Sequence, residues 1–161
     1  MNGAQDFITG MTHPLKFRLF LLSRLPAAFF SGVKVDQLTE ESCTASVPYR
    51  LFTRNPFRST YFACLAMAAE MSSGALAMAH LYNRKPAVSM LVTGFESSYH
   101  KKAVSRTFFT CNAGELFREA IEKTIATGEA QTVRAVATGR SASGDLIAEA
   151  IITWSFLVRK K

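Results

Sequence analysis

The longest apolar segment of the chain, residues 60–82, constrains the fold more than any other feature. Its apolar side chains fall on nearly every side of a helix, which is typical of a membrane span or of a fully buried helix. Glu70 lies near the centre of the segment and is followed by Ser72, Ser73 and Gly74. A carboxylate at mid-span costs about 2.5–3.5 kcal/mol on insertion scales. We therefore predict a helix buried in a protein core, and no membrane span.

Alternation of apolar and polar residues predicts five strands around this helix. The two-residue period runs through residues 42–51, 87–99, 103–111, 131–140 and 145–159. One parity of the last segment is apolar throughout: Leu146, Ala148, Ala150, Ile152, Trp154, Phe156 and Val158. The opposite parity is semi-apolar, which indicates contact with a second sheet or subunit. Pro48 has no amide hydrogen for a ladder, so we place the first strand near an edge of the sheet.

Two further helices are indicated by their ends. Pro14 suits the first turn of a helix over residues 14–25, and Pro26 ends it. Asn112 and Glu115 are similar to a capping box at the start of a second helix, and Gly128 closes that helix. The order of elements predicts an α+β fold. In this fold a curved antiparallel sheet of about five strands wraps around the long central apolar helix.

Charge and cysteine content limit the classes of function. The 161 residues suit one domain, and 19 Lys and Arg against 12 Asp and Glu give a net charge of +7. With only 19% charged residues, this bias favours an oligomer that buries surface, or an anionic partner. The basic residues are dispersed and no nucleic-acid motif occurs, so we expect no nucleic-acid partner. The cysteines have neither disulfide nor zinc spacing, and residues 1–10 lack a secretory pattern, so we expect a cytoplasmic protein without a metal.

Three stretches carry a resemblance to a known family. They are TRNPFRSTYF at 53–62, with Glu70 in the helix that follows, YHKKA at 99–103, and SGDLIAEA at 143–150 with Thr153 and Trp154. In this order and spacing, residues 15–158 resemble the hotdog fold of acyl-CoA thioesterases and dehydratases. The closer similarity is to an uncharacterised thioesterase-like branch of that superfamily.

The resemblance implies a single hotdog domain over residues 1–161, with the helix 14–25 packed on it. It implies a homodimer or a dimer of dimers, because the acyl channel of hotdog proteins lies between two subunits. The implied activity is hydrolysis of a fatty or aryl acyl-CoA, or of another acyl thioester, with coenzyme A as part of the substrate and no other cofactor. Two alternatives stay open. One is a non-catalytic protein that binds acyl or lipid ligands, and the other is an acyl dehydratase, whose required histidine none of His13, His80 and His100 matches in position.

The chain also departs from the pattern of thioesterases with this fold. Those enzymes commonly have His-Gly-Gly before the core helix and an Asp or Glu about seven residues further on. Here the first position reads Phe57-Arg58-Ser59, and the second is about Ala66. Glu70 lies four residues after Ala66 and therefore on roughly the same helix face.

The candidate catalytic residues are Glu70, Asn55, Ser59 and Thr60. Thioester hydrolysis needs a carboxylate as base or nucleophile and donors for the oxyanion. Glu70 is either that carboxylate or a structural one bonded to Arg54, Arg58 or a strand backbone. Asn55 either caps the helix or orients water or the carbonyl. The amides of Ser59 and Thr60, if free at the helix start, are candidate oxyanion donors.

Five basic residues are candidates for binding the phosphates of coenzyme A at the mouth of the channel. They are Arg54, Arg58, Lys101, Lys102 and Arg106. Arg and Lys form charge-assisted hydrogen bonds with phosphate, so their residue types suit this function. The alternative is a group of solvated charges without a common ligand.

Overall fold

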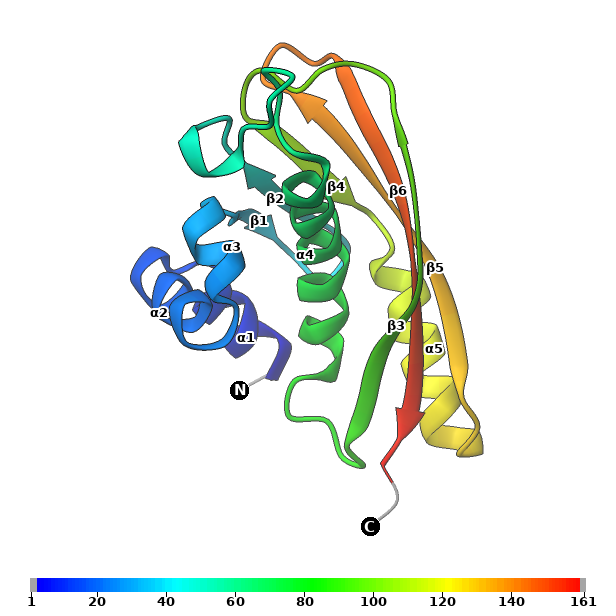
Figure 1. The fold of residues 1–161 in the computed structure, drawn as a ribbon. Helices are drawn as coiled ribbons and strands as arrows, with labels where there is room; N and C mark the ends of the chain where they lie inside the picture. Colours follow the sequence, from blue (N-terminus) through cyan, green and yellow to red (C-terminus); the bar gives the residue numbers. More distant parts are fainter. Residues whose placement is uncertain (1–2, 160–161) are drawn as a thin grey trace.

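A six-stranded antiparallel sheet bends around one long helix in a computed structural model that describes residues 3–159 (Figure 1). The strands lie in the order β1-β2-β4-β5-β6-β3. Their bounds are β1 Lys34–Leu38, β2 Cys43–Val47, β3 Val88–Tyr99, β4 Thr107–Cys111, β5 Gln131–Ser141 and β6 Leu146–Val158. The helices are α1 Gly3–Thr12, α2 Pro14–Arg24, α3 Pro26–Ser31, α4 Phe62–Leu81 and α5 Gly114–Thr127, with a 3-10 turn, η1, at Leu51–Thr53. This is the predicted α+β arrangement.

The central helix α4 is the buried helix that the apolar segment predicts. It is long and apolar enough to cross a membrane, but 67% of its most apolar 18-residue window is buried inside the protein. Its serines are accommodated by internal hydrogen bonds. The Ser72 hydroxyl donates to the Ala69 carbonyl over 2.8 Å, and the Trp154 indole donates to Ser73 Oγ over 3.0 Å. Burying these hydroxyls is therefore inexpensive, because each has a partner.

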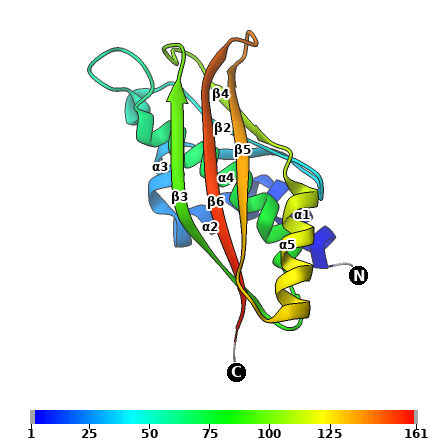
Figure 2. The ribbon, with the colours of Figure 1, turned by 90° about the vertical axis from the view of Figure 1, so that its right-hand side faces the viewer.

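The three longest strands form one side of the sheet and face α4 with the predicted parity. β6 pairs with β5 on one side and with β3 on the other, as Figure 2 shows. Ala148, Ala150, Ile152, Trp154 and Phe156 of β6 are all buried. β3 is an edge strand, and Leu91, Val92, Phe95 and Tyr99 on it remain exposed although they are large and apolar.

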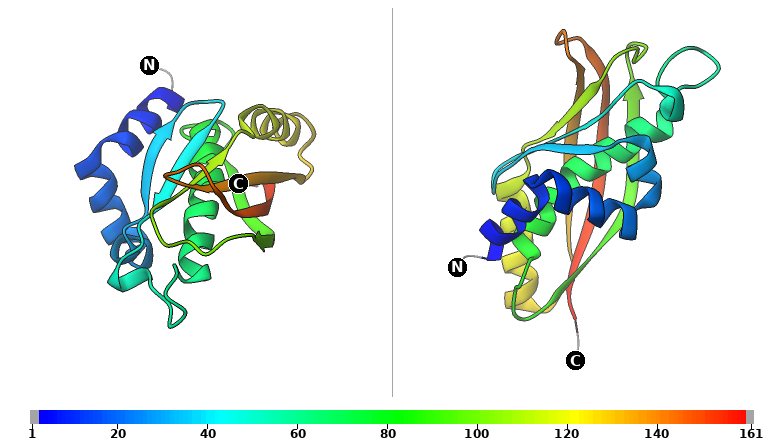
Figure 3. Two further views of the ribbon diagram at one scale, coloured as in Figure 1. Left: turned by 90° about the horizontal axis from the view of Figure 1, so that it is seen from above. Right: turned by 90° about the vertical axis from the view of Figure 1, so that its left-hand side faces the viewer.

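The three N-terminal helices form a layer beside the opposite edge of the sheet (Figure 3). α1 contacts both α4 and β1, and α2 contacts α1 and α3. Phe17 and Leu21 of α2 are buried, whereas Leu15, Leu19 and Leu22 are exposed. The predicted helix over 14–25 is present as α2.

The structure adds one strand and two helices to the predicted elements, and it differs from the prediction at the start of α5. The sixth strand is β1. The alternation does not predict it, because it is short and a bulge between Val35 and Gln37 breaks its pattern. The helices α1 and α3 are likewise additional to those predicted. β2 lies beside the edge strand β1, which agrees with its predicted place near an edge of the sheet, and Pro48 follows its last residue. No side chain caps α5, whose N-cap is Ala113, although Gly128 closes it as predicted, with φ of 74°.

Candidate functional site

A pocket of about 600 Å³ lies at the start of α4 and brings together most of the predicted site. We call it the helix-start pocket. It is lined by the loop before α4 and by the chain that follows β3: Asn55, Pro56, Phe57, Ser59, Thr60, Tyr61, Phe62, Leu65, Tyr99, His100, Lys101, Lys102 and Ala103. Its size is within the range of small-molecule pockets.

Asn55 organises the loop that forms one wall of this pocket. Its Oδ1 accepts the amides of Phe57 at 3.0 Å and Ser59 at 3.1 Å, and its Nδ2 donates to Ser59 Oγ at 3.0 Å. The backbone also closes on itself, because the Asn55 amide donates to the Ser59 carbonyl at 2.9 Å. Asn55 is therefore not the helix cap, since α4 begins at Phe62 with Tyr61 as its N-cap. Both groups of its amide are occupied in holding the loop.

The amides of Ser59 and Thr60 are not free, which corrects the assignment of oxyanion donors. The Ser59 amide donates to Asn55, and the Thr60 amide donates to the Ala103 carbonyl at 2.8 Å. The Thr60 hydroxyl donates to the same carbonyl at 3.1 Å. These bonds tie the loop to the chain after β3. Within residues 3–159, the amides of Phe62 and Ala63 are the ones at the start of α4 that have no acceptor.

The five basic candidates do not form one cluster. Lys101 and Lys102 line the helix-start pocket, whereas Arg54 and Arg58 belong to the loop beside it without lining it. The Lys101 ammonium lies 2.9 Å from Asp145 and, by hydrogen bonding, holds the pKa of that carboxyl below its usual value. Lys102 donates to the Phe57 carbonyl at 3.2 Å.

Arg106 is separate from the other four basic candidates. Its guanidinium donates to Ser46 Oγ at 3.0 Å and lines another cavity. The expectation of a single five-residue phosphate site is therefore wrong for Arg106.

Glu70 lies further along α4, where its Oε1 is close to Gly74, the glycine that faces Trp154 of β6. A narrow crevice, which we call the α4–β3 crevice and which is too small to hold a water molecule, shares Leu65 and Tyr99 with the helix-start pocket. Ala66 and Phe95 line this crevice, and Glu70 follows one helical turn after Ala66. Glu70 itself lines neither cavity within one protomer.

The Glu70 carboxylate is half-buried, and no hydrogen bond or ion pair reaches it from residues 3–159. The structural alternative required a bond to Arg54, Arg58 or a strand backbone, and none is present in that range. Burial raises the pKa of Glu70 above its usual value, because the charged form loses hydration and gains no compensating partner. Gly74 makes room for the carboxylate: a Cβ there would lie 3.1 Å from Glu70 Oε1. A carboxyl group with a raised pKa is a typical acid–base candidate.

His100 and Glu149 are functional candidates that the sequence patterns did not single out. His100 lines the helix-start pocket, and its Nε2 lies 3.3 Å from Glu149 Oε2. A carboxylate in this position orients an imidazole. The signal in the sequence was the placement of His100 beside Lys101 in the corner motif, but Glu149 is distant in the chain and only the β3–β6 pairing brings it close. The other histidines have structural contacts: His13 accepts the Lys16 amide, and His80 contacts the Glu40 carbonyl.

The three cysteines are buried, and none of them lines the helix-start pocket. Burial raises the pKa of Cys43 to about 12 and that of Cys111 to about 11, so both remain protonated thiols. In residues 3–159, no group of three or more His, Cys, Asp or Glu side chains could hold a metal ion.

Solved structures with the same architecture define the class of this fold. A protein of unknown function from Pseudomonas aeruginosa, described as a probable thioesterase, matches with a TM-score of 0.76 and 16% identity, over 93% of this chain and 99% of that one. A protein of unknown function from Chlorobaculum tepidum matches with a TM-score of 0.73 and 15% identity, over 94% and 99%. A thioesterase from Haemophilus influenzae matches with a TM-score of 0.63 and 14% identity, over 87% and 88%. The chain has the hotdog fold, as the resemblance implied.

The family can be stated more narrowly than the fold. Residues 17–156 match the family model described as a domain of unknown function, DUF4442. The chain belongs to the DUF4442 family. A comparison with curated proteins gave no match.

Proposed function

We propose that this protein hydrolyses acyl thioesters, with Glu70 as the general base or nucleophile. The observation that carries the proposal is a half-buried carboxylate with a raised pKa and no partner among residues 3–159, on the face of α4 next to the α4–β3 crevice. Such a group is costly to the fold, and enzymes keep such groups where an acid or base is needed. The thioesterase descriptions of proteins with the same fold support the reaction class.

The helix geometry argues that one protomer holds only part of the site. The free amides at the start of α4 are eight and seven residues before Glu70, which at 1.5 Å per residue places them ~10–12 Å from it along the helix. An oxyanion donor and a base that act on one carbonyl must each lie about 3 Å from the reacting atoms. We infer that the two groups of one α4 serve different thioesters. A second copy that brings its own α4 alongside would solve this problem.

The exposed edge strand supports a second copy of this chain as that partner. β3 is 12 residues long and presents unpaired backbone groups beside exposed Leu91, Val92 and Phe95. Long apolar edges of this kind are covered in most native proteins. We propose a homodimer through β3, in which the helix-start pocket of one protomer faces Glu70 of its partner. Lys101 and Lys102 then lie where they can bind the phosphates of coenzyme A.

The test is release of free thiol from acyl-CoA substrates with chains from two to sixteen carbons. We expect turnover with part of this series, and a decrease in kcat of about 10²–10⁴-fold in Glu70→Gln. Glu129→Gln, at an exposed carboxylate after α5, is the matched control and should retain full activity. Full activity in Glu70→Gln would refute the catalytic role of Glu70. No turnover with any acyl chain length would refute the proposal that this protein is a thioesterase. An acyl ligand found by mass spectrometry in such an inactive protein would favour the non-catalytic alternative.

A further inference from the structure

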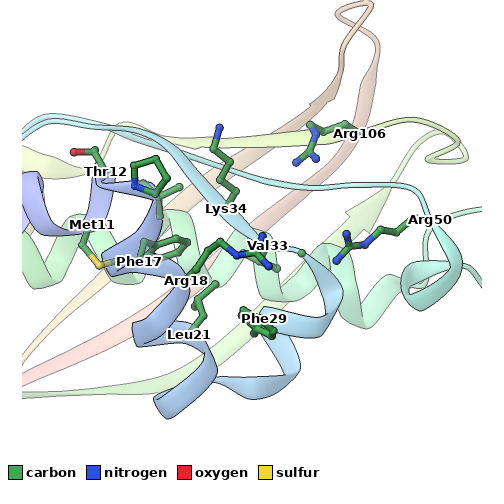
Figure 4. A pocket seen from close by; sticks show the side chains of 13 residues that line it. Met11, Thr12, Phe17, Arg18, Leu21, Phe29, Val33, Lys34, Arg50 and Arg106 are labelled. Atoms are coloured by element: carbon green, nitrogen blue, oxygen red, sulfur yellow. The ribbon is translucent and has the colours of Figure 1, made fainter.

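A second cavity lies between the N-terminal helices and the start of β1, and the proposed thioesterase activity does not use it. It has a volume of about 270 Å³ and shares no lining residue with the helix-start pocket. Met11, Phe17, Leu21, Phe29 and Val33 form its apolar wall. Four of these side chains belong to the hydrophobic core, and Phe29 is packed against it. We call this cavity the arginine pocket, because Arg18, Arg50 and Arg106 also line it (Figure 4).

The three guanidinium groups reach the pocket from three separate elements. Arg18 comes from α2, and its Cζ lies 5.0 Å from the centre of the Phe29 ring. Arg50 follows β2, and its Nη2 donates to the Phe30 carbonyl at 2.9 Å. Arg106 precedes β4. In Figure 4 the Arg50 and Arg106 side chains extend toward the pocket from the side opposite α2.

None of these arginines is neutralised by a carboxylate within residues 3–159. No Asp or Glu lines the pocket, and no ion pair in that range involves Arg18, Arg50 or Arg106. Lys34, the fourth cation at the pocket, differs because its ammonium lies 3.1 Å from Asp36. A guanidinium has five N–H donors. The hydrogen bond to the Phe30 carbonyl uses one nitrogen of Arg50, and the hydrogen bond to Ser46 Oγ uses one nitrogen of Arg106. Donors therefore remain for a ligand.

The backbone is shaped to hold Arg50 at this place. Gly32 has φ of 73°, and a Cβ on it would lie 2.7 Å from Arg50 Cζ. A side chain at position 32 would thus displace the guanidinium. Gly32 itself closes α3 and lines the pocket. The guanidinium is held between the Phe30 carbonyl and this glycine, which reduces the entropy cost of using it to bind a ligand.

We propose that the arginine pocket binds a single-chain anionic amphiphile, with a carboxylate or phosphate head between the arginines and the chain against the apolar wall. Guanidinium groups pair with these two heads through charge-assisted hydrogen bonds. The apolar wall excludes a fully hydrated ion such as sulfate as the preferred ligand, because that ion would leave this surface uncovered. At roughly 30 Å³ for each water-sized atom, the cavity holds about nine such atoms. This suits a chain of about eight carbons whose head group lies outside this volume, among the guanidinium groups at its edge.

The experiment is isothermal titration calorimetry of the full chain with octyl phosphate, octanoate and inorganic phosphate, all as monomeric solutes. We expect both amphiphiles to bind at least tenfold more tightly than inorganic phosphate. From butyl to octyl phosphate the affinity should rise by about fourfold per methylene, and it should level off when the chain outgrows the cavity. Inorganic phosphate binding as tightly as octyl phosphate would overturn the proposal, because the apolar wall would then contribute nothing.

Matched variants locate the ligand. Arg50→Gln and Arg106→Gln should each weaken octyl phosphate binding by about tenfold. Arg140→Gln is the control: it also removes a guanidinium that donates to a backbone carbonyl, that of Gly144 at 3.0 Å, but on the β5–β6 turn. We expect less than a twofold change there. Equal affinity in all three variants would overturn the site.

Two further measurements distinguish the arginine pocket from the thioester channel and from a membrane-binding surface. Glu70→Gln should bind octyl phosphate as the wild type does, whatever its thioesterase activity, so the two proposals can fail independently. A loss of octyl phosphate binding in Glu70→Gln would place the ligand in the thioester channel and overturn the inference. Binding to phosphatidylglycerol vesicles without binding of octyl phosphate would also overturn it, because the arginines would then serve a membrane surface.

Discussion

The contact between Gly139 and Phe109 offers a quantitative test of how tightly the sheet is packed against α4. The two residues are register partners on β5 and β4, and Phe109 is fully buried. A Cβ on Gly139 would lie 2.5 Å from Cε1 and 2.6 Å from Cζ of the Phe109 ring. Ordinary carbon–carbon contacts lie at about 3.5–4.0 Å, so in Gly139→Ala the ring must move by roughly 1 Å. Phe109 also lines the α4–β3 crevice with Leu65 and Ala66, and displacement of the ring would narrow that crevice.

The expected cost of Gly139→Ala follows from two opposing effects. Overpacking of a core costs about 1–3 kcal/mol, whereas replacing glycine by alanine returns about 0.4–1 kcal/mol through the unfolded chain. We therefore expect a net loss of about 1–2 kcal/mol in the free energy of unfolding. For a chain of this length that corresponds to a decrease in Tm of about 2–8 °C.

The assay is urea denaturation followed by the fluorescence of Trp154, the single tryptophan of the chain. Phe109→Leu removes the ring that clashes, so the double variant should show a favourable coupling energy of about 0.5–3 kcal/mol. Gly10→Ala is the matched control, because a Cβ at this helical position meets no atom within 4 Å and should stabilise by about 0.5–1 kcal/mol. Unchanged stability in Gly139→Ala, or additive effects in the double variant, would refute the packing argument.

Three other predictions concern charge, backbone conformation and assembly. Burial raises the pKa of Glu70 in the folded state, so the wild type should lose stability as the pH rises from the ordinary carboxyl pKa through the raised one. Glu70→Gln should remove this loss. The prediction would be contradicted if the urea midpoints of the two proteins changed in parallel between pH 4 and 8. Gly128→Ala should lower the free energy of unfolding by about 1–2 kcal/mol, because the φ of 74° at this position is unfavourable for a residue with a side chain. A Cβ there meets no atom within 4 Å, so steric contact adds nothing to this cost. A variant that unfolds at the same temperature as the wild type would exclude this strain. Phe95→Lys, at the β3 edge, should give a monomer in light scattering at a concentration where the wild type is dimeric. Leu157→Lys, with nearly the same exposure on an interior strand, should stay dimeric, and a dimer of Phe95→Lys would count against assembly through β3.

The sequence was sufficient for the elements whose burial pattern is regular. The apolar segment predicts α4 within two residues at either end, since a helix surrounded by protein is apolar on all sides. The alternation in 145–159 predicts β6 and its buried face, because one parity of that strand lies against α4. β1 could not be predicted, because it lacks such a regular pattern. It is only five residues long and contains a bulge, so its apolar residues show no clear two-residue period.

The candidate site was predictable as a neighbourhood but not as a set of contacts. The motifs at 53–62 and 99–103 do meet in the helix-start pocket, as their resemblance to hotdog proteins implied. The hydrogen-bond and ion-pair partners of individual side chains and amides could not be predicted from the sequence. The Thr60 amide is bound by Ala103, and Glu149 reaches His100, through pairings between distant parts of the chain.

Residue types and their local periods determined that this chain has a buried central helix, a curved antiparallel sheet and a surplus of cations. These properties depend on near neighbours in the chain, because side-chain direction repeats every 3.6 residues in a helix and every two in a strand. Only the tertiary structure decided that Glu70 lacks a partner among the described residues. It also decided that Arg106 lines a cavity with Arg18 and Arg50, away from the other basic candidates. Such choices depend on which distant segments the sheet brings within hydrogen-bonding distance. Spacing along the chain carries no information on that distance.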